Sequence, residues 1–401
     1  MNKVDLFHSS DEHVMLRRTV REFVTREVEP QALEFDRKEK FNLPLFRKLG
    51  TLGLLGITVP DEYGGSGLDP VAAVIAHEEL SASDPGFCLA YLAHAMLCAN
   101  NIAVNASPEQ KKRFLPKLCS GEAIGAMGLS EPGVGTDVLG MRTQAVRKGD
   151  RYVINGRKMW ITNGCTDEGK TPCDVLLLYA RTGAAGNAEE RARISTFIIE
   201  RSMPGFSVGQ KIMDKAGMRA SNTAELVFDD CEVPLSHLIG KEGESTKHMM
   251  QNLEIERLTL AAMALGIARR ALQVMIRYAN ERTAFGSKLT QFGQIQRHIG
   301  DSYAEYQAAR SYVYSTATNL QLAGAGNRLD SDGVKLVASR CGKVIADRAI
   351  QVLGGYGYVG EYVVERLWRD AKLLEIGGGT LEAHEKNITA DLSRMQDVLL
   401  R

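Results

Sequence analysis

The sequence predicts a mostly α-helical protein with a β module in its middle. Apolar residues recur at helical spacing from about residue 9 to 120, and they do so again after residue 236. Between these parts, residues 121–235 hold short β-branched and aromatic runs separated by Gly, Asn, Asp and Pro. Because 401 residues are too many for one small core, we expect three units, at 1–120, 121–235 and 236–401.

In the first unit the helical prediction depends on spacing and on two start signals. The apolar residues that recur are Val14, Leu16, Val20, Phe23 and Val24. Asp69-Pro70 and Ser107-Pro108 each combine a capping residue with a following proline, which is typical of a helix start. Residues 63–67, Tyr-Gly-Gly-Ser-Gly, predict a loop just before the first of these starts.

The β module is predicted from four short runs, and the last unit from four long helical segments. The runs lie at 152–156, 174–179, 194–199 and 224–228, with a surface loop expected at 183–193. The helical segments lie near 245–282, 290–324, 329–355 and 361–397, with breaks at 286, 324–326, 354–360 and 377–379. Long helices joined by short breaks predict a helix bundle.

Composition excludes several classes of function. The 49 basic residues balance 49 acidic ones, which argues against a general nucleic-acid binder. No run of eighteen apolar residues is present, so we expect no membrane span. Seven cysteines without a C-x-x-C pair predict reduced thiols, mostly in the core. The eight histidines form no H-E-x-x-H cluster, so no metal site is expected.

The N-terminal residues 1–5 are neither arginine-rich nor followed by a signal-type apolar core. We therefore expect a cytoplasmic protein of bacterial type. A mitochondrial matrix location would require a presequence that has been removed.

Two nucleotide-binding patterns occur in contexts that argue against them. Residues 164–171 satisfy the P-loop pattern, but Pro172 and a strand-like run follow, where a P-loop requires a helix. Asp167 and Glu168 would also repel phosphate. Residues 355–360 spell G-x-G-x-x-G, yet the segment before them is helix-like and no βαβ unit surrounds it. A P-loop nucleotide-binding protein is kept as the alternative from a different class.

The most apolar helical stretch, residues 253–260, carries two carboxylates. Desolvation on an apolar helix face raises the pKa of a carboxylate, which suits a general base near neutral pH. Glu256 shares a face with Leu253 and Leu260, whereas Glu254 shares one with Leu258 and Leu265, so periodicity does not choose between them. The alternative is a buried ion pair with an arginine, for which the candidates are Arg257, Arg269 and Arg270.

Three further segments have the chemistry of a binding site. The triple glycine 377–379 offers a pocket wall without side chains and with free backbone N–H groups. Together with a buried base, this wall predicts proton abstraction from a bulky, weakly acidic substrate. Residues 129–137 and 160–164 are turn-rich strand ends that suit a planar cofactor, or are plain hairpin ends. Residues 282–286 have two readings. They are either the C-terminal cap of a helix, or a binding segment in which Arg282 contacts a phosphate and Phe285 stacks on a ring.

Together these segments resemble the acyl-CoA dehydrogenase family across nearly the whole chain. The motifs that carry the resemblance are LSEPGVGTD at 129–137, WITNG at 160–164, MRAS at 218–221, R-x-x-FG at 282–286, QVLGGYGY at 351–358 and RDAK at 369–372. The resemblance implies a helical N-terminal domain, a middle β-barrel and a C-terminal four-helix bundle. It also implies FAD, an acyl-CoA substrate, an electron-transfer flavoprotein as electron acceptor, and a homotetramer.

Most members of this family carry their catalytic Glu in a late Tyr-Glu-Gly-Thr motif, which here reads Gly377-Gly378-Gly379-Thr380. The isovaleryl-CoA dehydrogenase and long-chain branches place it earlier, in Leu-x-x-Glu-Arg-Leu, and residues 253–258 fit that pattern. The resemblance, which is closest to the isovaleryl-CoA branch, therefore selects Glu256 as the base.

The resemblance also implies roles for other positions. Gly378 joins Glu256 in catalysis, through its backbone N–H. FAD contacts are implied for Met127, Leu129, Ser130, Gly135, Thr136, Trp160, Ile161 and Thr162 at the isoalloxazine, for Arg282, Phe285, Gln351, Leu353, Gly354 and Gly355 at the pyrophosphate and adenosine across a subunit boundary, and for Thr380 and Glu382. Contacts to the acyl-CoA are implied for Leu97, Thr136, Glu254, Arg257, Gly378 and Gly379.

Three departures from the family pattern bear on the substrate. Gly293 stands where Gln is usual, so one FAD contact is lost or falls to Gln294, and residues 165–173 form an insertion. Gly378 replaces Ala, which predicts a wider acyl pocket and a substrate other than isovaleryl-CoA. The alternatives within the same fold are a flavin oxidase, a monooxygenase or a thioester-processing enzyme.

Overall fold

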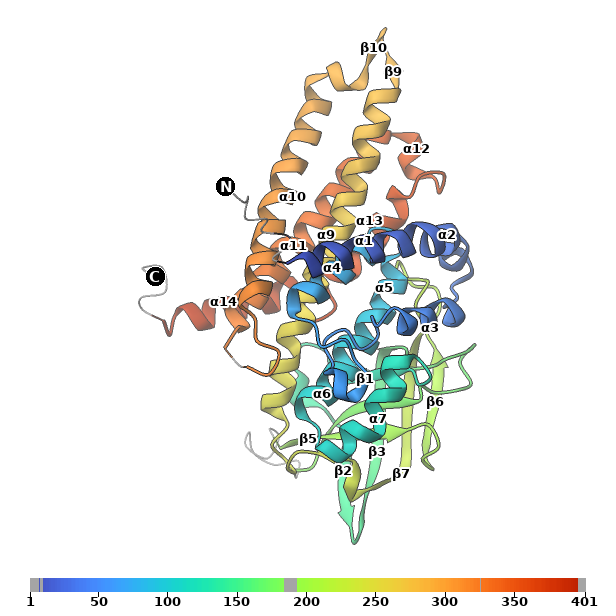
Figure 1. Cartoon of the computed structure of the whole chain (residues 1–401), viewed down its shortest axis with the longest axis vertical. Helices are drawn as coiled ribbons and strands as arrows, with labels where there is room; N and C mark the ends of the chain where they lie inside the picture. Colours follow the sequence, from blue (N-terminus) through green and yellow to red (C-terminus); the bar gives the residue numbers. More distant parts are fainter. Residues whose placement is uncertain (1–6, 8–9, 184–192, 325, 396–401) are drawn as a thin grey trace.

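The computed structural model describes residues 7, 10–183, 193–324 and 326–395, so most of the loop predicted at 183–193 lies outside the described residues. Helical parts from the two ends of the sequence pack together, the strands of the middle part gather at one end of the molecule, and the short hairpin β9-β10 lies at the other end (Figure 1). This order of helices, strands and helices confirms the predicted layout.

The N-terminal part is helical, and both predicted start signals are confirmed. Asp69 accepts a hydrogen bond from the N–H of Ala72, and Ser107 forms a capping box with Gln110. The helices are α1 (Asp11–Phe23), η1 (Val24–Val28), α2 (Glu29–Lys38), α3 (Leu43–Thr51), η2 (Asp61–Tyr63), α4 (Pro70–Ser81), α5 (Pro85–Leu92), η3 (Ala93–Asn100), α6 (Asn101–Asn105) and α7 (Pro108–Ser120). Of these, η1 and η3 are π-helical, a conformation that is frequent at functional sites.

The middle part is one mixed sheet of eight strands with the order β6-β7-β3-β2-β4-β5-β8, and β1 pairs in parallel with β4. The strands are β1 (Gly125–Gly128), β2 (Gln144–Lys148), β3 (Arg151–Thr162), β4 (Val175–Arg181), β5 (Ile194–Glu200), β6 (Phe206–Lys211), β7 (Thr223–Pro234) and β8 (Leu238–Ile239), with short 3-10 turns at Val138–Gly140 (η4) and Leu235–His237 (η5). All four predicted strands are confirmed.

The predicted β-barrel is not confirmed. Within the described residues the path of paired strands has two ends, β6 and β8, and no closed barrel is found. The strands β2 and β4 meet at a single pair, Gln144 and Arg181, so the sheet divides there into two halves. A one-residue connection allows the halves to fold toward each other without closing a ring.

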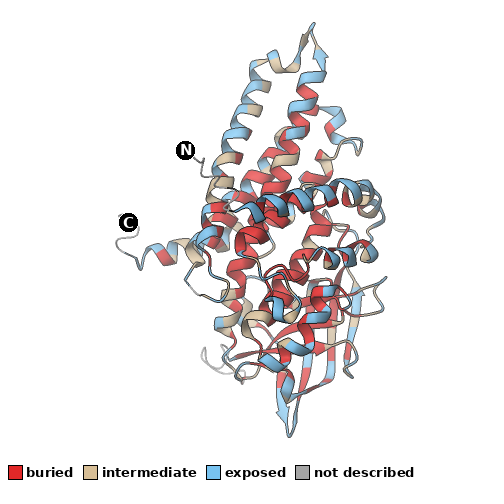
Figure 2. Cartoon of the chain, viewed as in Figure 1, coloured by how far each residue is buried: buried red, intermediate tan, exposed pale blue. Residues whose placement is uncertain are grey.

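The C-terminal part consists of long helices whose breaks fall at the predicted glycines. These are α9 (Thr246–Glu281), the hairpin β9 (Thr283–Ala284) and β10 (Ser287–Lys288), η6 (Leu289–Gln291), α10 (Gly293–Asn319), α11 (Arg328–Leu353), α12 (Gly355–Tyr358), α13 (Val364–Leu374) and α14 (Leu381–Leu392). Helix α9 packs against α4, α10 and α11, and Figure 2 shows it buried along most of its length. One core therefore joins the two helical parts.

Two helical runs, Pro85–Asn105 and Thr246–Glu281, are long and apolar enough to cross a membrane by length and composition alone. In their most apolar windows 83% and 78% of the residues are buried inside the fold, and core helices of soluble proteins also have these properties. All seven cysteines are buried free thiols, as predicted.

The residues that spell the P-loop pattern form a turn that is filled by their own side chain. Asp167 Oδ1 accepts hydrogen bonds from the N–H groups of Gly169, Lys170 and Thr171. These are amides that a P-loop would offer to phosphate, and no helix follows them. Residues 355–360 follow the helix α11 rather than a strand. Neither pattern therefore has the structure of a nucleotide site.

Candidate active site

Glu256 lies on α9 among apolar neighbours and is only 8% exposed. Its Oε2 atom has no hydrogen-bond partner in the part of the chain that the structure describes. Burial raises the pKa of this carboxyl to about 7, although the positive charges of Arg257 and Lys335 lower it in part. A carboxyl with a pKa near 7 can accept a proton at neutral pH.

The alternative reading, an ion pair of Glu256 with an arginine, is wrong, because each candidate arginine has another partner. Arg257 lies 3.0 Å from Asp332, Arg269 lies 2.7 Å from Glu79, and Arg270 lies 2.5 Å from Glu29. Each of these partners comes from a different helix, so spacing along α9 gave no indication of them. Within the described ranges, the carboxyl of Glu256 is therefore left without a counter-ion contact.

Glu254 is also buried, but its carboxyl is engaged. Its Oε2 atom accepts a hydrogen bond of 3.1 Å from the N–H of Asn327, in the connection between α10 and α11. Burial raises the pKa of Glu254, and this hydrogen bond opposes the shift. The structure thus distinguishes the two carboxylates that periodicity left equivalent.

The triple glycine forms a loop that faces Glu256. A Cβ atom on Gly378 would lie 3.5 Å from Glu256 Oε1 and would collide with Leu260 Cδ1. The φ angle of Gly378 is +69°, which disfavours any other residue. Leu260 therefore takes up part of the room that the missing side chain leaves. Among the described residues, no acceptor binds the N–H groups of Gly378 and Gly379.

Three buried polar residues around this loop were missed by sequence reasoning. His384 contacts Gly379 O at 3.0 Å, and Asp332 binds both His384 and Arg257. Lys335 donates to Leu374 O, and burial lowers the pKa of its ammonium to about 8. Asp332 and Lys335 lie on α11, three positions apart. Charged residues on the inner face of a helix are the signal that could have found them.

A second candidate wall is built by the strand end of β3. Trp160 has φ +59°, lies at a bulge between Lys158 and Ile161, and is 55% exposed. A bulky residue at positive φ is uncommon and marks a functional candidate. The N–H of Met159 donates to Ser130 O at 2.9 Å. The two segments predicted to face the isoalloxazine, 127–136 and 160–162, therefore lie together.

This wall is open to a ligand and is joined to α9. A Cβ atom on Gly133 or Gly135 would meet no atom within 4 Å, so backbone is accessible there. Leu129 packs with Met249 and Leu253, which lie about two turns and one turn before Glu256 on α9. Leu97, on η3, belongs to the core cluster that includes Leu260. The segment that contains Leu129 is thus joined to the helix that carries the predicted base.

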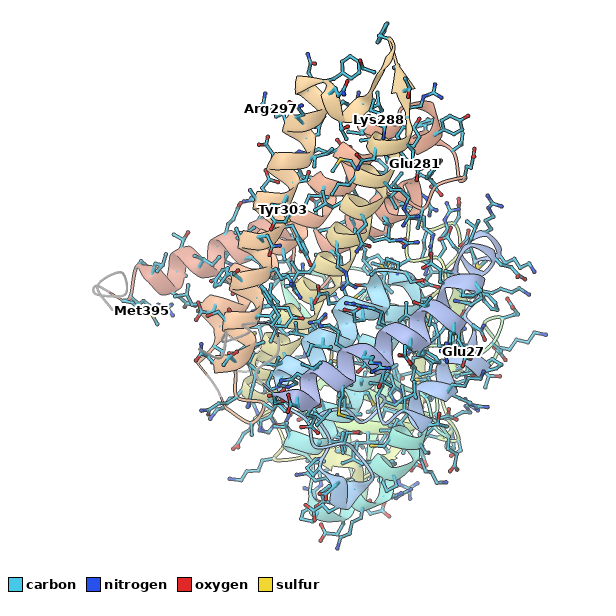
Figure 3. All side chains as sticks on the ribbon, turned by 45° about the horizontal axis from the view of Figure 1, so that its top comes forward. Glu27, Glu281, Lys288, Arg297, Tyr303 and Met395 are labelled. Carbon is cyan, nitrogen blue, oxygen red and sulfur yellow. The ribbon has the colours of Figure 1, made fainter. Side chains whose placement is uncertain are left out.

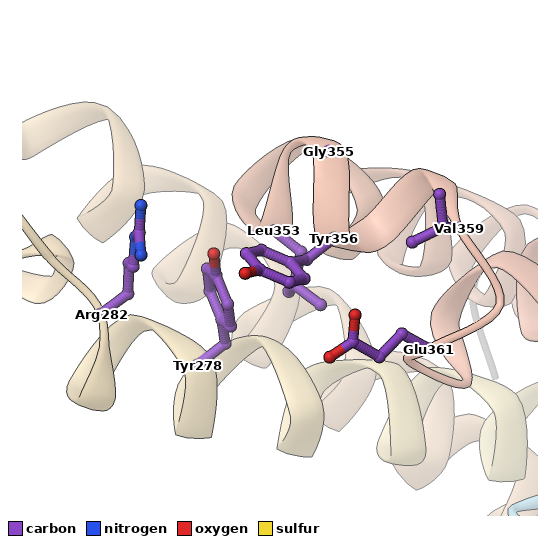
Figure 4. A pocket seen from close by; sticks show the side chains of 7 residues that line it. All are labelled: Tyr278, Arg282, Leu353, Gly355, Tyr356, Val359 and Glu361. Carbon is purple, nitrogen blue, oxygen red and sulfur yellow. The ribbon is translucent and has the colours of Figure 1, made fainter.

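The other predicted FAD residues lie elsewhere. Arg282, Leu353 and Gly355 line a pocket of about 370 Å³ at the far end of the bundle (Figure 4). The remaining lining residues are Tyr278, Tyr356, Val359 and Glu361. Glu256 lies on α9, and Arg282 follows the last residue of this helix, 26 positions later. At a rise of 1.5 Å per residue, the two residues are about 39 Å apart along the helix. One chain therefore does not bring the two groups together.

The remaining predicted positions are accessible. Gln351 and Gly354 are exposed beside this pocket, and Phe285, at the hairpin tip, is 97% exposed. Thr380 caps the start of α14, where Glu382 is exposed.

Three family descriptions match nearly all of the chain. The N-terminal domain of acyl-CoA dehydrogenases matches residues 10–122, the middle domain 126–231 and the C-terminal domain 246–393. The chain is 44% identical to the mitochondrial isovaleryl-CoA dehydrogenase of Bos taurus over 93% of its length and 86% of that protein. It belongs to the acyl-CoA dehydrogenase family.

Other relatives in this family differ in the substrate that they name. The short-chain-specific acyl-CoA dehydrogenase of Clostridium acetobutylicum is 40% identical over 97% of this chain and 100% of that protein. The structure of butyryl-CoA dehydrogenase from Megasphaera elsdenii superimposes with a TM-score of 0.90 at 35% identity, over 96% of this chain and 98% of that chain. A glutaryl-CoA dehydrogenase from Mycobacterium smegmatis, solved with FADH2, gives 0.89 at 30% identity, over 97% and 96%.

The family consists of FAD-dependent oxidoreductases, and the residues of this chain fit the cofactor. The open backbone at Gly133 and Gly135 beside the exposed Trp160 suits a planar ring, and Arg282 at the distant pocket suits a pyrophosphate. No group of three or more His, Cys, Asp or Glu that could hold a metal ion occurs in the described residues.

Proposed function

We propose that this protein dehydrogenates an acyl-CoA thioester between its α and β carbons, giving the trans-2-enoyl-CoA, with Glu256 as the base. The observation that carries the proposal is the buried carboxyl of Glu256, which lacks a counter-ion contact and faces the bare loop at Gly378. A pKa of about 7 leaves a useful fraction of this group ionised at neutral pH. The helix holds it against a wall that suits a flavin.

The α-proton of a thioester is only weakly acidic, so the site must stabilise negative charge on the thioester oxygen. The free N–H of Gly378 is the donor that we propose for this oxygen. Because that donor belongs to the backbone, the loop needs no side chain at position 378. Leu97, Thr136, Glu254, Arg257 and Gly379 are the further acyl-CoA contacts that we propose.

We propose that FAD is held by Met127, Leu129, Ser130, Gly135, Thr136, Trp160, Ile161, Thr162, Thr380 and Glu382 of one subunit, and by Arg282, Phe285, Gln351, Leu353, Gly354 and Gly355 of another. When bound, FAD supplies the hydride acceptor for the β-hydrogen. The separation of about 39 Å between Glu256 and Arg282 supports a site shared between subunits.

We also propose a homotetramer in the cytoplasm, with an electron-transfer flavoprotein as the acceptor and domains at 1–120, 121–235 and 236–401 around a middle barrel. Large apolar side chains remain exposed on the C-terminal helices, such as Phe285, Tyr358 and Tyr303 at 97%, 83% and 57%. Figure 3 shows Tyr303 on the outer side of α10. Exposed apolar surface of this kind supports contacts between subunits.

For the substrate we propose a short, medium or branched acyl group. The named relatives act on isovaleryl-CoA, butyryl-CoA and other short acyl-CoAs. The space left by Gly378 favours an acyl group other than isovaleryl, but Leu260 fills part of it, so the gain in width is smaller than the substitution alone implies.

The test is anaerobic bleaching of the bound flavin by a panel of saturated acyl-CoAs. We expect complete bleaching by at least one member of short, medium or branched chain, and slow reoxidation of the reduced flavin by air. Rapid reoxidation by air would instead favour an oxidase or monooxygenase. A yellow protein whose spectrum no acyl-CoA changes would refute the proposal.

A further inference from the structure

His384 lies one turn into α14 and folds back onto the glycine loop. Its Nε2 atom is 3.0 Å from Gly379 O and its Nδ1 atom is 2.5 Å from Asp332 Oδ1. Both side chains are fully buried. Because a carbonyl oxygen only accepts hydrogen bonds, Nε2 must carry the proton in the first of these contacts.

The second contact then requires one more proton. With Nε2 already protonated, the bond between Nδ1 and Asp332 needs a hydrogen on the ring or on the carboxyl. Arg257 lies 3.0 Å from the same Oδ1 atom of Asp332, so this carboxyl joins His384 to Arg257. The hydrogen-bond pattern therefore places His384 between Gly379 O and a carboxyl that also binds an arginine.

The same carboxylate anchors both glycine carbonyls. Arg257, which Asp332 holds, directs its Nε atom to Gly378 O at 3.5 Å, while His384 binds Gly379 O. The ring also packs against the loop, since a Cβ atom on Gly379 would lie 2.9 Å from His384 Cε1. Because a peptide group is planar, Gly378 O shares its plane with the N–H of Gly379, and Gly379 O shares its plane with the N–H of Thr380. The two contacts therefore hold the chain directly after the N–H of Gly378, where glycines have wide backbone freedom.

We propose that His384 and Asp332 are positioning residues, which hold the glycine loop so that the N–H of Gly378 points at the thioester oxygen. This inference rests on the proposed function. It assigns a task to two buried residues from α14 and α11 to which the proposed function gives no contact with substrate or FAD. Through the contacts of His384 and Arg257 with the backbone, the pair restricts a segment that three successive glycines would otherwise leave free to move.

Two substitutions of similar size separate positioning from packing. In His384→Gln the side-chain amide nitrogen takes the place of Nε2, so the donor to Gly379 O remains and the contact with Asp332 is lost. In His384→Asn it takes the place of Nδ1, so the contact with Asp332 remains and the loop is released. We expect His384→Gln to keep kcat within about threefold, and His384→Asn to lose about 10- to 100-fold in kcat with a smaller change in KM.

If His384 served only packing or charge balance, kcat would fall more in His384→Gln than in His384→Asn. The reason is that His384→Asn keeps a partner for the buried carboxyl of Asp332. That order, or equal kcat in both variants and the wild type, would overturn the proposal. Retained FAD absorbance shows that each variant is folded. Should His384→Asn fail to fold, Asp332→Asn takes its place, with the same expected loss in kcat, and an unchanged kcat would overturn the proposal equally.

A second readout does not depend on turnover. A non-oxidisable acyl-CoA analogue that ionises at its α carbon gives a long-wavelength charge-transfer band with oxidised FAD. We expect the apparent pKa of the analogue to rise by about one unit, or tenfold, in His384→Asn and to stay unchanged in His384→Gln. If the apparent pKa of the analogue were unchanged in both variants, the positioning role would be overturned. The proposed function would still stand in that case, provided that the wild type oxidises an acyl-CoA. A wild type that oxidises no acyl-CoA would instead overturn the proposed function, and this role with it.

Discussion

Glu256→Gln is expected to make the enzyme inactive and more stable at the same time. The amide has nearly the same shape as the carboxyl but cannot accept the α-proton, so we expect turnover to fall at least about 100-fold, the usual scale of general-base catalysis. Burial raises the pKa of Glu256 from 4.5 to about 7. Since one pKa unit corresponds to 1.36 kcal/mol, the ionised group destabilises the native state by up to about 3 kcal/mol.

The sign of this effect sets its pH dependence. The native state binds the proton of Glu256 more tightly than the unfolded state does, so the wild type loses stability as pH rises from about 4.5 through 7. Below that window both states are protonated and the difference between wild type and variant vanishes. Glu256→Gln should therefore gain up to about 3 kcal/mol in the free energy of unfolding at pH 8 and almost nothing at pH 4.

The assay combines denaturant unfolding at both pH values with steady-state turnover of the FAD-loaded enzyme. Glu281→Gln is the matched control, because Glu281 lies on the same helix but is exposed, and it should change neither quantity. If Glu256→Gln lost activity and also lost stability at pH 8, the carboxyl of Glu256 could not be buried without a counter-ion in the wild type. Turnover within a few-fold of the wild type would remove Glu256 from its role as base.

Three further predictions concern pH, the loop and the fold. In the wild type, kcat/KM should rise tenfold per pH unit below about pH 7 and level off above it, since Glu256 must be ionised; a profile that stays flat from pH 5 to 8 would exclude it. Gly378→Ala should lose both stability and turnover through its positive φ and the collision with Leu260, measured by thermal unfolding and kcat. Glu79→Gln should destabilise the protein by about 3–5 kcal/mol, measured by denaturant unfolding, because it breaks buried contacts with Arg17 and Arg269.

Local signals in the sequence predicted the long helices and four of the eight strands in the middle sheet, whereas β1, β2, β6 and β8 were missed. The proline and capping residues at Asp69 and Ser107 start helices because their contacts span only three residues. Gly354 ends α11 for an equally local reason, since it occupies the C-cap at a positive φ angle. Whether the sheet closes into a barrel was not predictable in the same way, since closure depends on pairing between strands far apart in the chain, and no closed barrel is found within the described residues.

The candidate site was predictable only in part. Burial of the 253–260 stretch and a raised pKa at Glu256 followed from apolar periodicity. The choice between Glu254 and Glu256 did not, because it depends on Asn327, 73 positions away from Glu254. The partner of Arg257, Asp332, is likewise brought in by the packing of α11 on α9. Long-range contacts of this kind leave no periodic trace in the sequence.

Placing the base on a helix separates two demands that a loop would have to meet together. A raised carboxylate pKa requires a rigid apolar environment, and α9 supplies one because its neighbours pack on it from several sides. A donor for the thioester oxygen requires a free backbone N–H, which the loop at Gly378 supplies because it carries no side chain to cover it. A glutamate at position 378 itself would have to adopt φ +69° and displace Leu260. The double variant Glu256→Gly/Gly378→Glu should therefore regain only part of the activity lost in Glu256→Gly, whereas full recovery would show that the loop accepts both tasks without strain.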